Sequence, residues 1–372
     1  MSVSAPMPVR LDGSAVPVKV TQDRTLRVKI TEACGPACTF CHNEGTPVAA
    51  DNRRHAPGGY TVAGPSGRRS IYLASNGASF LPATIAPDEA FTRALRLLGE
   101  ALDVDEVHLT GGEPTLHPRL TRIVRVVRGA GLRARMTSNG ETGLGPVQQA
   151  ARAGLEAVTF SIFGTTPAEL TSVQGSRDIT PARAEKKIRA LRSAVHAALA
   201  CQIGVNANIV VPDVTHAARV HALLDGFGSH LSVRLLNSLD EGKQSLDAIE
   251  AILDGLGAVP VGQHLIAGSS GWRTTYRLPS GRRIQVKRIR PVRLPGVCGD
   301  CRFNNPFDCQ EGYYGVRLYR DRAGGYQVGV CLRRMDRCLP VEDFARSDLP
   351  RQIIALRESQ YLQLAAESPL AT

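Results

Sequence analysis

Short runs of β-branched and other apolar residues alternate along the chain with longer stretches in which apolar residues recur every three or four positions. The longer stretches, such as those from Phe91 to Leu102 and from Ile188 to Leu199, have the period of amphipathic helices. The short runs predict six strands, at residues 26–31, 106–110, 133–138, 157–163, 202–211 and 231–236. Strands that alternate with helices pair in parallel through right-handed crossovers. The pattern therefore predicts an α/β fold, either an open wound sheet or an incomplete barrel, with ligands at the carboxyl ends of its strands.

Two segments depart from this alternation. Residues 42–86 form a long stretch rich in Gly, Pro and Ala, and we expect a lid there because loops of this length are commonly lids or disordered. Further along, TTYRL pairs with RRIQVKRIR and GVRLYRD with YQVGVCL across short Gly-containing turns, which predicts two hairpins in a small β appendage. The expected parts are an N-terminal extension (1–25), an α/β domain (26–256), a β-rich region (257–345) and a C-terminal helix and tail (346–372).

Composition describes a globular chain of 372 residues, with 43% hydrophobic and 5% aromatic residues. No apolar run approaches the roughly 18 residues of a membrane span, and the first residues lack the apolar core of a signal peptide. We therefore expect no membrane partner and a cytoplasmic location, where the nine cysteines stay reduced.

The net charge of +11 admits nucleic acid, a membrane surface or an acidic small molecule as a partner. One segment, residues 271–293, carries many basic residues and no acid. If it faces the barrel mouth, its arginines could bind a phosphate or carboxylate; if it faces solvent, it is only a charged surface. Aromatic residues are too sparse there to favour single-stranded nucleic acid, so nucleic acid is not the expected partner.

Three cysteines, Cys34, Cys38 and Cys41, stand in one loop with the spacing C-x3-C-x2-C. Three thiolates can hold a cubane iron-sulfur cluster and leave one iron open for chemistry. A structural zinc site would normally pair two C-x2-C knuckles or add two histidines, and a disulfide framework needs an oxidising compartment. Inert buried thiols would not be expected to cluster beside Gly35 and Pro36. The loop is therefore predicted to be a reactive metal site.

Two further motifs follow the next strands. Gly111, Gly112, Glu113 and Pro114 come directly after the strand at 106–110; two glycines allow the backbone to approach a ligand closely, and the carboxylate could receive an ammonium group. Ser138 and Asn139 follow the next strand and could contact a hydroxyl or carboxylate. A simple turn remains the alternative for each motif.

These features together, CGPACTFC with its Phe40, then GGEP, TSNG and the strand FSIFG, resemble the radical S-adenosylmethionine (radical SAM) superfamily over most of residues 26–240. The resemblance implies a partial (β/α)6 barrel of the TIM type, with a [4Fe-4S] cluster on Cys34, Cys38 and Cys41 and SAM chelating the fourth iron. It also implies a set of SAM contacts: Phe40 and the GGEP residues Gly111, Gly112, Glu113 and Pro114, then Ser138 and Asn139 near the ribose or carboxylate, Ser161 near the ribose, and the 203–211 strand with Asn208 near the adenine.

The activity implied by this resemblance is reductive cleavage of SAM to a 5'-deoxyadenosyl radical, which abstracts a hydrogen from the substrate. Such an enzyme needs a reductant such as flavodoxin or ferredoxin. The cofactors carry the difficult chemistry, and the protein fixes the distance between the radical and its target and excludes solvent.

The C-terminal region resembles the auxiliary-cluster domain of the molybdopterin-precursor GTP cyclases, called MoaA-like. That resemblance implies a second [4Fe-4S] cluster on Cys298, Cys301 and Cys331. Cys309 could close this cluster as a fourth ligand, and Cys338 stays unassigned. Cys201 stands alone and is expected to belong to the core.

Three departures argue against a true GTP cyclase: the C-terminus lacks the family's glycine pair, the gap between Cys301 and Cys331 is enlarged, and residues 42–86 have no recognised counterpart. We therefore expect a small nucleotide- or sugar-like substrate, phosphorylated or acidic, in the biosynthesis of a cofactor or specialised metabolite. The alternatives are an enzyme that modifies a ribosomal peptide and, outside enzymes, a metal-stabilised nucleic-acid-binding module. The last leaves GGEP and the six strands unexplained.

Overall fold

The computed structural model describes residues 16–36, 38, 41, 77–174, 179–228, 230–238, 241–305 and 308–368. Phe40 and most of the expected lid, residues 42–76, lie outside this part of the chain. Within it, none of the helices is both long and apolar enough to cross a membrane.

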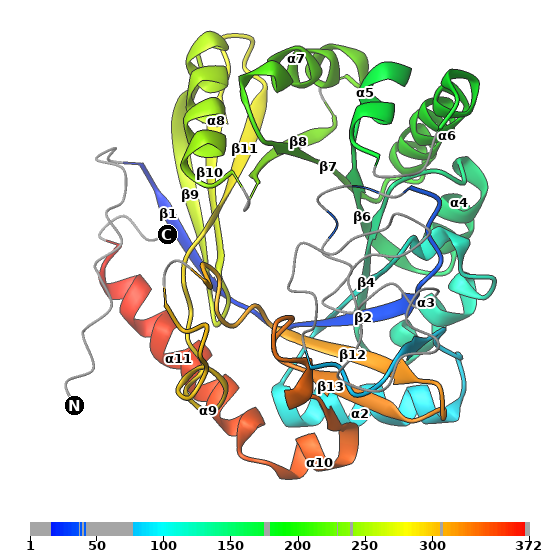
Figure 1. Cartoon of the computed structure of the whole chain (residues 1–372), viewed down its shortest axis with the longest axis vertical. Helices are drawn as coiled ribbons and strands as arrows, with labels where there is room; N and C mark the ends of the chain where they lie inside the picture. The colour runs from blue at the N-terminus through cyan, green and yellow to red at the C-terminus, as the bar shows by residue number, and fades with distance from the viewer. Residues whose placement is uncertain are drawn as a thin grey trace.

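Six parallel strands form the curled sheet of a half-barrel (Figure 1). In spatial order they are β2 (Thr25–Thr31), β4 (Glu106–Gly111), β5 (Arg133–Ser138), β6 (Leu155–Ser161), β7 (Gly204–Val211) and β8 (Ser232–Asn237). All six lie where the sequence predicts them, within two residues at each end. The prediction of a partial (β/α)6 barrel is therefore confirmed.

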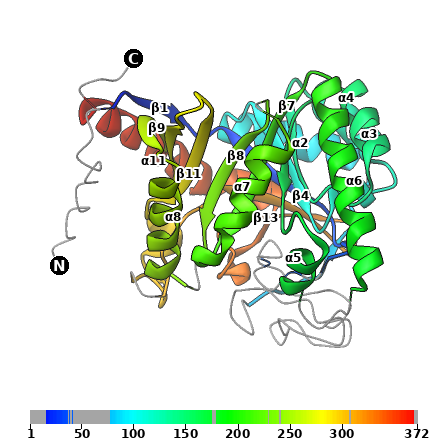
Figure 2. The same cartoon turned by 90° about the horizontal axis from the view of Figure 1, so that it is seen from above.

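Helices cover the outer side of this sheet (Figures 1 and 2). They are α2 (Glu89–Leu102), α3 (Leu120–Gly129), α4 (Leu144–Arg152), α5 (Pro167–Ser172), α6 (Pro181–Ala200), α7 (Ala217–Gly226) and α8 (Lys243–Gly255). In α2, Asp88 caps the first turn by accepting from the Phe91 amide at 2.9 Å, and the buried face packs against β-strand residues such as Leu26 and Val28 in one core cluster. The outer helices thus bury the apolar face of each strand, and the alternate residues are left to face the barrel interior.

The two predicted hairpins form, but they extend the barrel sheet and do not build a sheet of their own. In the first, β11 (Arg283–Ile289) pairs in parallel with β8, and β10 (Gly271–Arg277) and β9 (Val259–Ala267) follow as antiparallel strands. In the second, β12 (Val316–Asp321) pairs in parallel with β2 and continues into β13 (Tyr326–Gly329) and β14 (Leu339–Pro340), while β3 (Pro82–Ala83) pairs with β12. The physical reason is that β8 and β2 would otherwise expose unpaired backbone groups at the edges of the half-barrel.

The N-terminal segment, expected to be an extension, contributes β1 (Val18–Gln22), which pairs in parallel with β9. Only Asp23 and Arg24 separate β1 from β2, so the far end of the curled sheet is brought back to its start. The Asp23 amide donates to the Ala267 carbonyl at 2.8 Å. Three further helices, α9 (Pro295–Cys298), α10 (Val341–Arg346) and α11 (Leu349–Ala366), complete this side of the molecule, with α11 lying against β1 and β9 (Figure 1).

Arg357 of α11 lies where the end of α2 and the turn between β1 and β2 come together. Its side chain is 3% exposed, and Nη1 donates to the Leu102 carbonyl at 3.0 Å and to the Asp23 carbonyl at 3.4 Å. Nη2 lies 3.4 Å from the Asp103 carboxylate. One guanidinium therefore ties α11 to the end of α2 and to the turn between β1 and β2.

We predict that Arg357→Met lowers the free energy of unfolding by about 2 kcal/mol, because it leaves buried carbonyls without a donor. Urea denaturation measures this effect. Arg351→Met on the same helix removes an exposed guanidinium that pairs with Asp348 and should leave the free energy almost unchanged. Equal losses in the two variants would contradict a closing role for Arg357.

Candidate functional site

The cysteine loop opens onto one cavity of about 220 Å³ at the carboxyl ends of the parallel strands. The predicted site residues that line it are Cys34, Cys38, Cys41, Gly112, Glu113, Ser138, Asn139, Ser161 and Asn208. Gly111 and Pro114 are not among the lining residues. Pro36, Thr137, Phe163, Val210 and Leu236 also line the cavity. Val210 lies in the 203–211 strand expected near the adenine, and the other four were not predicted as site residues, because a single residue of these types carries no distinctive signal.

Gly111 and Gly112 make their close approach to the chain that leads into the cysteine loop. The Gly112 amide donates to the Thr31 carbonyl at 2.8 Å, and the Glu113 amide donates to the Ala33 carbonyl at 2.7 Å. A Cβ on Gly112 would stand 2.3 Å from the Ala33 oxygen, and one on Gly111, whose φ is +144°, would stand 2.4 Å from the Thr31 oxygen. The glycines therefore fasten the GGEP turn to residues 31–33, whereas the sequence suggested that they make room for a ligand.

Glu113 is 1% exposed and uses both carboxylate oxygens within the protein. Oε1 accepts from the Thr115 amide at 2.9 Å and from the Ser138 hydroxyl at 2.7 Å, and Oε2 accepts from the Asn139 amide at 2.5 Å. Burial raises the pKa of Glu113 above its ordinary value, while these hydrogen bonds favour the ionised form. Glu113 thus joins the end of β4 to the end of β5 while remaining part of the cavity wall. Its contact with a ligand's ammonium group stays a prediction.

Asn139 connects the end of β5 with the cysteine loop. Its side-chain Nδ2 lies 3.7 Å from Cys34 Sγ and 3.3 Å from Glu141 Oε1. Glu141 Oε1 also accepts from the Gly35 amide at 2.8 Å, and Lys187 of α6 forms an ion pair with Glu141 Oε2. Sequence reasoning missed Glu141 and Lys187, because a charge in a turn or on a helix is more often solvated.

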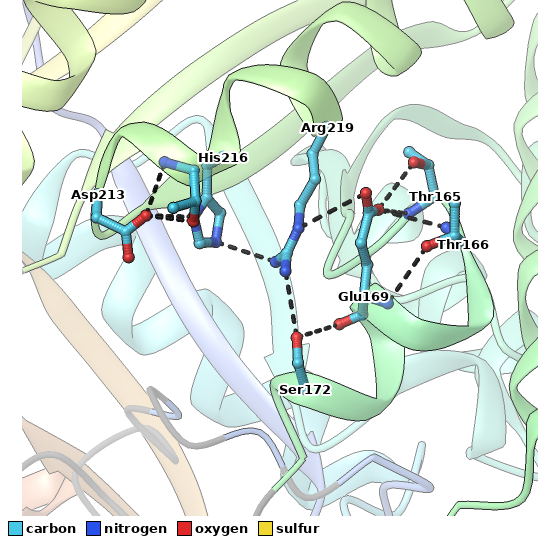
Figure 3. Close-up of polar contacts among 8 residues, drawn as sticks. Thr165, Thr166, Glu169, Ser172, Asp213, His216 and Arg219 are labelled. Carbon is cyan, nitrogen blue, oxygen red and sulfur yellow. Dashed lines mark hydrogen bonds and ion pairs between the residues drawn. The ribbon is translucent and has the colours of Figure 1, made fainter.

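Helix α5 supports the cysteine loop from another side. Cys38 forms an isolated antiparallel bridge with Gln174, which comes shortly after α5. Arg219 of α7 holds α5, since it donates to the Ser172 hydroxyl at 3.2 Å and lies 3.8 Å from the Glu169 carboxylate (Figure 3).

The same Arg219 also fixes His216, which precedes α7 (Figure 3). A guanidinium can only donate, so the contact of 3.0 Å from Arg219 to His216 Nε2 makes Nε2 an acceptor and leaves Nδ1 as the donor toward Asp213. Burial, followed by the positive charge of Arg219, lowers the pKa of His216. The histidine is therefore neutral and structural.

Four of the C-terminal cysteines, Cys298, Cys301, Cys309 and Cys331, line a second, smaller cavity together with Arg293 and Arg334. Each sulfur has an N–H donor nearby: the Leu294 amide for Cys298, the Arg334 side chain for Cys301, the Gly312 amide for Cys309 and the Arg333 and Arg334 amides for Cys331. Such donors are typical of thiolates that ligate an iron-sulfur cluster. Burial raises the pKa of the Cys331 thiol to about 11, so this group needs a cation to become a thiolate at neutral pH.

The two remaining cysteines, Cys201 and Cys338, line neither cavity. Cys338 Sγ lies 3.9 Å from Met335 Sδ, in a small apolar cluster with Tyr319. Cys201 follows α6 directly and is half-buried.

A parallel half-barrel with three cysteines of one loop at its carboxyl mouth defines an α/β barrel enzyme whose reactive group sits at the strand ends. Residues 28–223 match the family model described as the Radical SAM superfamily. The chain belongs to that superfamily and is a radical SAM enzyme.

Curated relatives and solved structures give more distant likenesses. The chain is 29% identical over 290 residues to a probable GTP 3',8-cyclase of Aeropyrum pernix, which covers 75% of this chain and 69% of the relative. It is 23% identical over 354 residues to a probable GTP 3',8-cyclase of Sulfurisphaera tokodaii, and this alignment covers 92% of this chain and 93% of the relative. Among solved structures, SuiB of Streptococcus suis has a TM-score of 0.40 at 13% identity, covering 66% of this chain and 49% of SuiB. Methylornithine synthase has a TM-score of 0.39 at 13% identity, and the likeness covers 64% of this chain and 63% of the synthase.

Membership of this superfamily implies SAM and a [4Fe-4S] cluster, and the first cavity fits both. Asn208 Oδ1 is buried without a hydrogen-bond partner among the described residues and lines the cavity with Ser161, so a ligand with polar groups would satisfy it. Phe163, Val210 and Leu236 offer apolar surface for a base. In the described residues no three His, Cys, Asp or Glu side chains converge on a position for a single metal ion; a cubane spreads its thiolates over separate irons.

We predict that Gly112→Ala destabilises the protein by about 1–3 kcal/mol, because the added Cβ meets a backbone oxygen that cannot move without shifting the cysteine loop. The variant should also retain much less iron after anaerobic reconstitution. Gly99→Ala in α2 is the control, since its Cβ meets nothing within 4 Å and should raise stability by about 0.5 kcal/mol. Full iron content in Gly112→Ala would refute the role assigned to this contact.

Proposed function

We propose that this radical SAM enzyme abstracts a hydrogen from a small nucleotide- or sugar-like substrate that carries an anionic group, in the biosynthesis of a cofactor or specialised metabolite. The observation that carries the proposal is a group of cations on the inner face of the sheet beside the first cavity, called here the cation layer. Its members are Arg27 of β2, Arg135 of β5, Arg234 of β8, Arg273 of β10 and Lys287 of β11. Of these, Arg135 lies 3.5 Å from the Glu106 carboxylate. The proposal is further supported by the distant relatives, whose name assigns them GTP as substrate.

Two members of the layer stand two positions before residues of the cavity wall on the same strands, and strand residues two apart face the same side. Arg135 precedes the cavity residue Thr137 by two positions, and Arg234 stands in the same relation to Leu236. A substrate that reaches from the first cavity to the cation layer would have one end near the cysteine loop and the other among the guanidinium groups.

Arg234 and Arg273 are two of these cations whose charged form is disfavoured by burial. Arg234 donates to two neutral oxygens, Gln285 Oε1 at 2.9 Å and Asn206 Oδ1 at 2.8 Å. Burial, together with the charges of Arg273 and Arg135, lowers the pKa of Arg234 to about 9. Burial likewise lowers the pKa of Arg273. Grouped cations of this kind cost folding free energy, and an anionic ligand would offset that cost.

Tyr314 stands at the centre of the layer. The cationic groups of Arg27, Lys287 and Arg317 lie 4.5, 4.8 and 5.1 Å from its ring centroid, and Lys287 Nζ lies 2.9 Å from its hydroxyl. Burial alone would raise the pKa of Tyr314, but Arg27 and Lys287 outweigh it and the pKa falls to about 8. The same two cations, Arg27 and Lys287, would attract an anionic substrate.

Under this proposal each group of residues has its own role in the reaction. SAM and the cluster, when bound, supply the 5'-deoxyadenosyl radical. Cys34, Cys38 and Cys41 would hold the cluster, and the predicted SAM contacts that line the cavity, such as Ser161 and Asn208, would orient SAM. The cation layer would hold the anionic end of the substrate, so that its target C–H is at a fixed distance from the radical. Cys298, Cys301 and Cys331, with Cys309 as a fourth ligand, would hold a second [4Fe-4S] cluster.

Anaerobic reconstitution tests the two clusters. We predict about eight irons per chain, since each cubane contains four, and reductant-dependent release of 5'-deoxyadenosine from SAM. Cys34→Ala should abolish the release because it removes a ligand of the SAM-binding cluster, whereas Cys298→Ala should keep some uncoupled cleavage. Release that survives Cys34→Ala but not Cys298→Ala would reverse the assignment of the two sites.

The anion site can be tested without knowing the substrate. We predict that pyrophosphate raises the pKa of Tyr314 above about 8, because it cancels the positive potential that favours the tyrosinate. Ultraviolet difference absorbance, with Tyr314→Phe as the blank, follows the titration. Lys287→Met should raise the same pKa without any ligand. A tyrosinate titration that pyrophosphate leaves unchanged would contradict the proposed site.

A further inference from the structure

An ion pair outside the first cavity bears directly on the first cysteine of the loop. The side chains of Glu141 and Lys187 are 9% and 13% exposed, and their charged groups are in contact. Neither residue lines the cavity, so neither would touch SAM or substrate there. Their influence on the loop runs through Gly35 and Asn139, both of which contact Glu141 Oε1.

The contacts fix the chain at Cys34 from two directions. The Gly35 amide, the next peptide after Cys34, donates to Glu141 Oε1 at 2.8 Å. Asn139 is held by Glu141 at both ends of its side-chain amide, since the Glu141 amide donates to Oδ1 at 2.9 Å. This orientation points Asn139 Nδ2 toward Cys34 Sγ at 3.7 Å. A Cβ on Gly35 would stand 1.8 Å from Glu141 Oε2 and 2.7 Å from Lys187 Nζ, so a larger residue at this position would push the ends of both side chains aside.

The charges of Glu141 and Lys187 would also affect how easily the cluster is reduced. A buried carboxylate beside a thiolate-ligated cluster disfavours the reduced state, because reduction adds a further negative charge to the same place. Lys187 cancels that carboxylate while leaving its oxygens free to accept from Gly35 and Asn139. The pair therefore supplies hydrogen-bond acceptors at a net charge of zero.

We propose that Glu141 and Lys187 are positioning residues that hold Cys34 and set the reduction potential of the cluster it ligates. This inference rests on the proposed role of Cys34 as a cluster ligand. Glu141 alone would make the cluster harder to reduce, and Lys187 alone would make it easier. Together the two residues keep the hydrogen bonds to Gly35 and Asn139 and add no net charge, so the reduction potential is shifted in neither direction by their charges.

The test is a redox titration of the reconstituted cluster followed by electron paramagnetic resonance. The full-length chain carries Cys298→Ala and Cys301→Ala, so that only the first site binds a cluster. In this background Lys187→Met should shift the midpoint potential to more negative values, and Glu141→Gln should shift it to more positive values. The double variant should return toward the parent, and Lys187→Arg should restore the parent potential.

Glu185 and Arg189 provide the matched control, because they form an ion pair on the same helix with both side chains largely exposed. Arg189→Met should leave the potential unchanged. Iron content and thermal unfolding of each variant show whether it folds and binds a cluster, and Glu141→Gln keeps an acceptor for the Gly35 amide. Shifts of the same sign in Lys187→Met and Glu141→Gln, or no shift in either, would overturn the inference.

The two proposals fail in different ways. If Cys34→Ala binds as much iron as the parent in the single-site background, Cys34 is not a ligand and the proposed function loses its first site. If Cys34→Ala loses the iron while the potentials of Lys187→Met and Glu141→Gln equal that of the parent, the cluster assignment stands and only the role of the ion pair is refuted.

Discussion

The contact on which the site depends is the one between two backbone segments, the GGEP turn after β4 and residues 31–33 after β2. Two amide-to-carbonyl hydrogen bonds, from Gly112 and Glu113 to Thr31 and Ala33, join the ends of neighbouring strands. No side chain fits between them, since a Cβ on either glycine would overlap a carbonyl oxygen. The contact therefore fixes where the chain leaves β2, and with it where Cys34 begins the cysteine loop.

The other supports of the loop converge on the same few residues. Glu113 extends the contact sideways to β5, because it accepts from the Ser138 hydroxyl and the Asn139 amide. Asn139 then reaches Cys34, and the bridge between Gln174 and Cys38 adds a connection from α5. A loop that lies at the mouth of a barrel is thus held by the ends of several strands, which is the kind of rigid support that a site needs for a fixed geometry.

The sequence predicted the elements better than it predicted their partners. Each of the six barrel strands and both hairpins has a local pattern, of period two or of continuous apolar residues, that survives without tertiary information. The pairing of β11 with β8 and of β12 with β2 joins segments far apart in the chain, and no local pattern encodes it. β1 was missed for the same reason, since its five residues gain their place only from β9.

The candidate site shows the same limit at the level of single residues. The cysteine triplet and GGEP could be found because their spacing is distinctive, whereas Glu141 and Lys187 are ordinary charges until the fold buries them together. The sequence correctly marked Gly111 and Gly112 as sites of a close approach, but it could not tell whether that approach is made to a ligand or to another part of the chain.

The path of the sheet also explains why the two halves of the chain would serve different purposes under the proposed function. The superfamily match ends at residue 223, before β8, and the residues proposed to hold SAM and its cluster lie within it. The strands that follow curl the sheet round until β10 and β11 face β2 across the interior, which brings Arg273 and Lys287 within reach of the charges of Arg27 and Tyr314. These later strands join the barrel by backbone pairing at its edges and by side-chain contacts such as that between Arg234 and Gln285. Under the proposed function, the curled sheet thus brings cations of the later strands, Arg273 and Lys287, to the same interior as the radical-forming site, where they would meet the charge of the substrate.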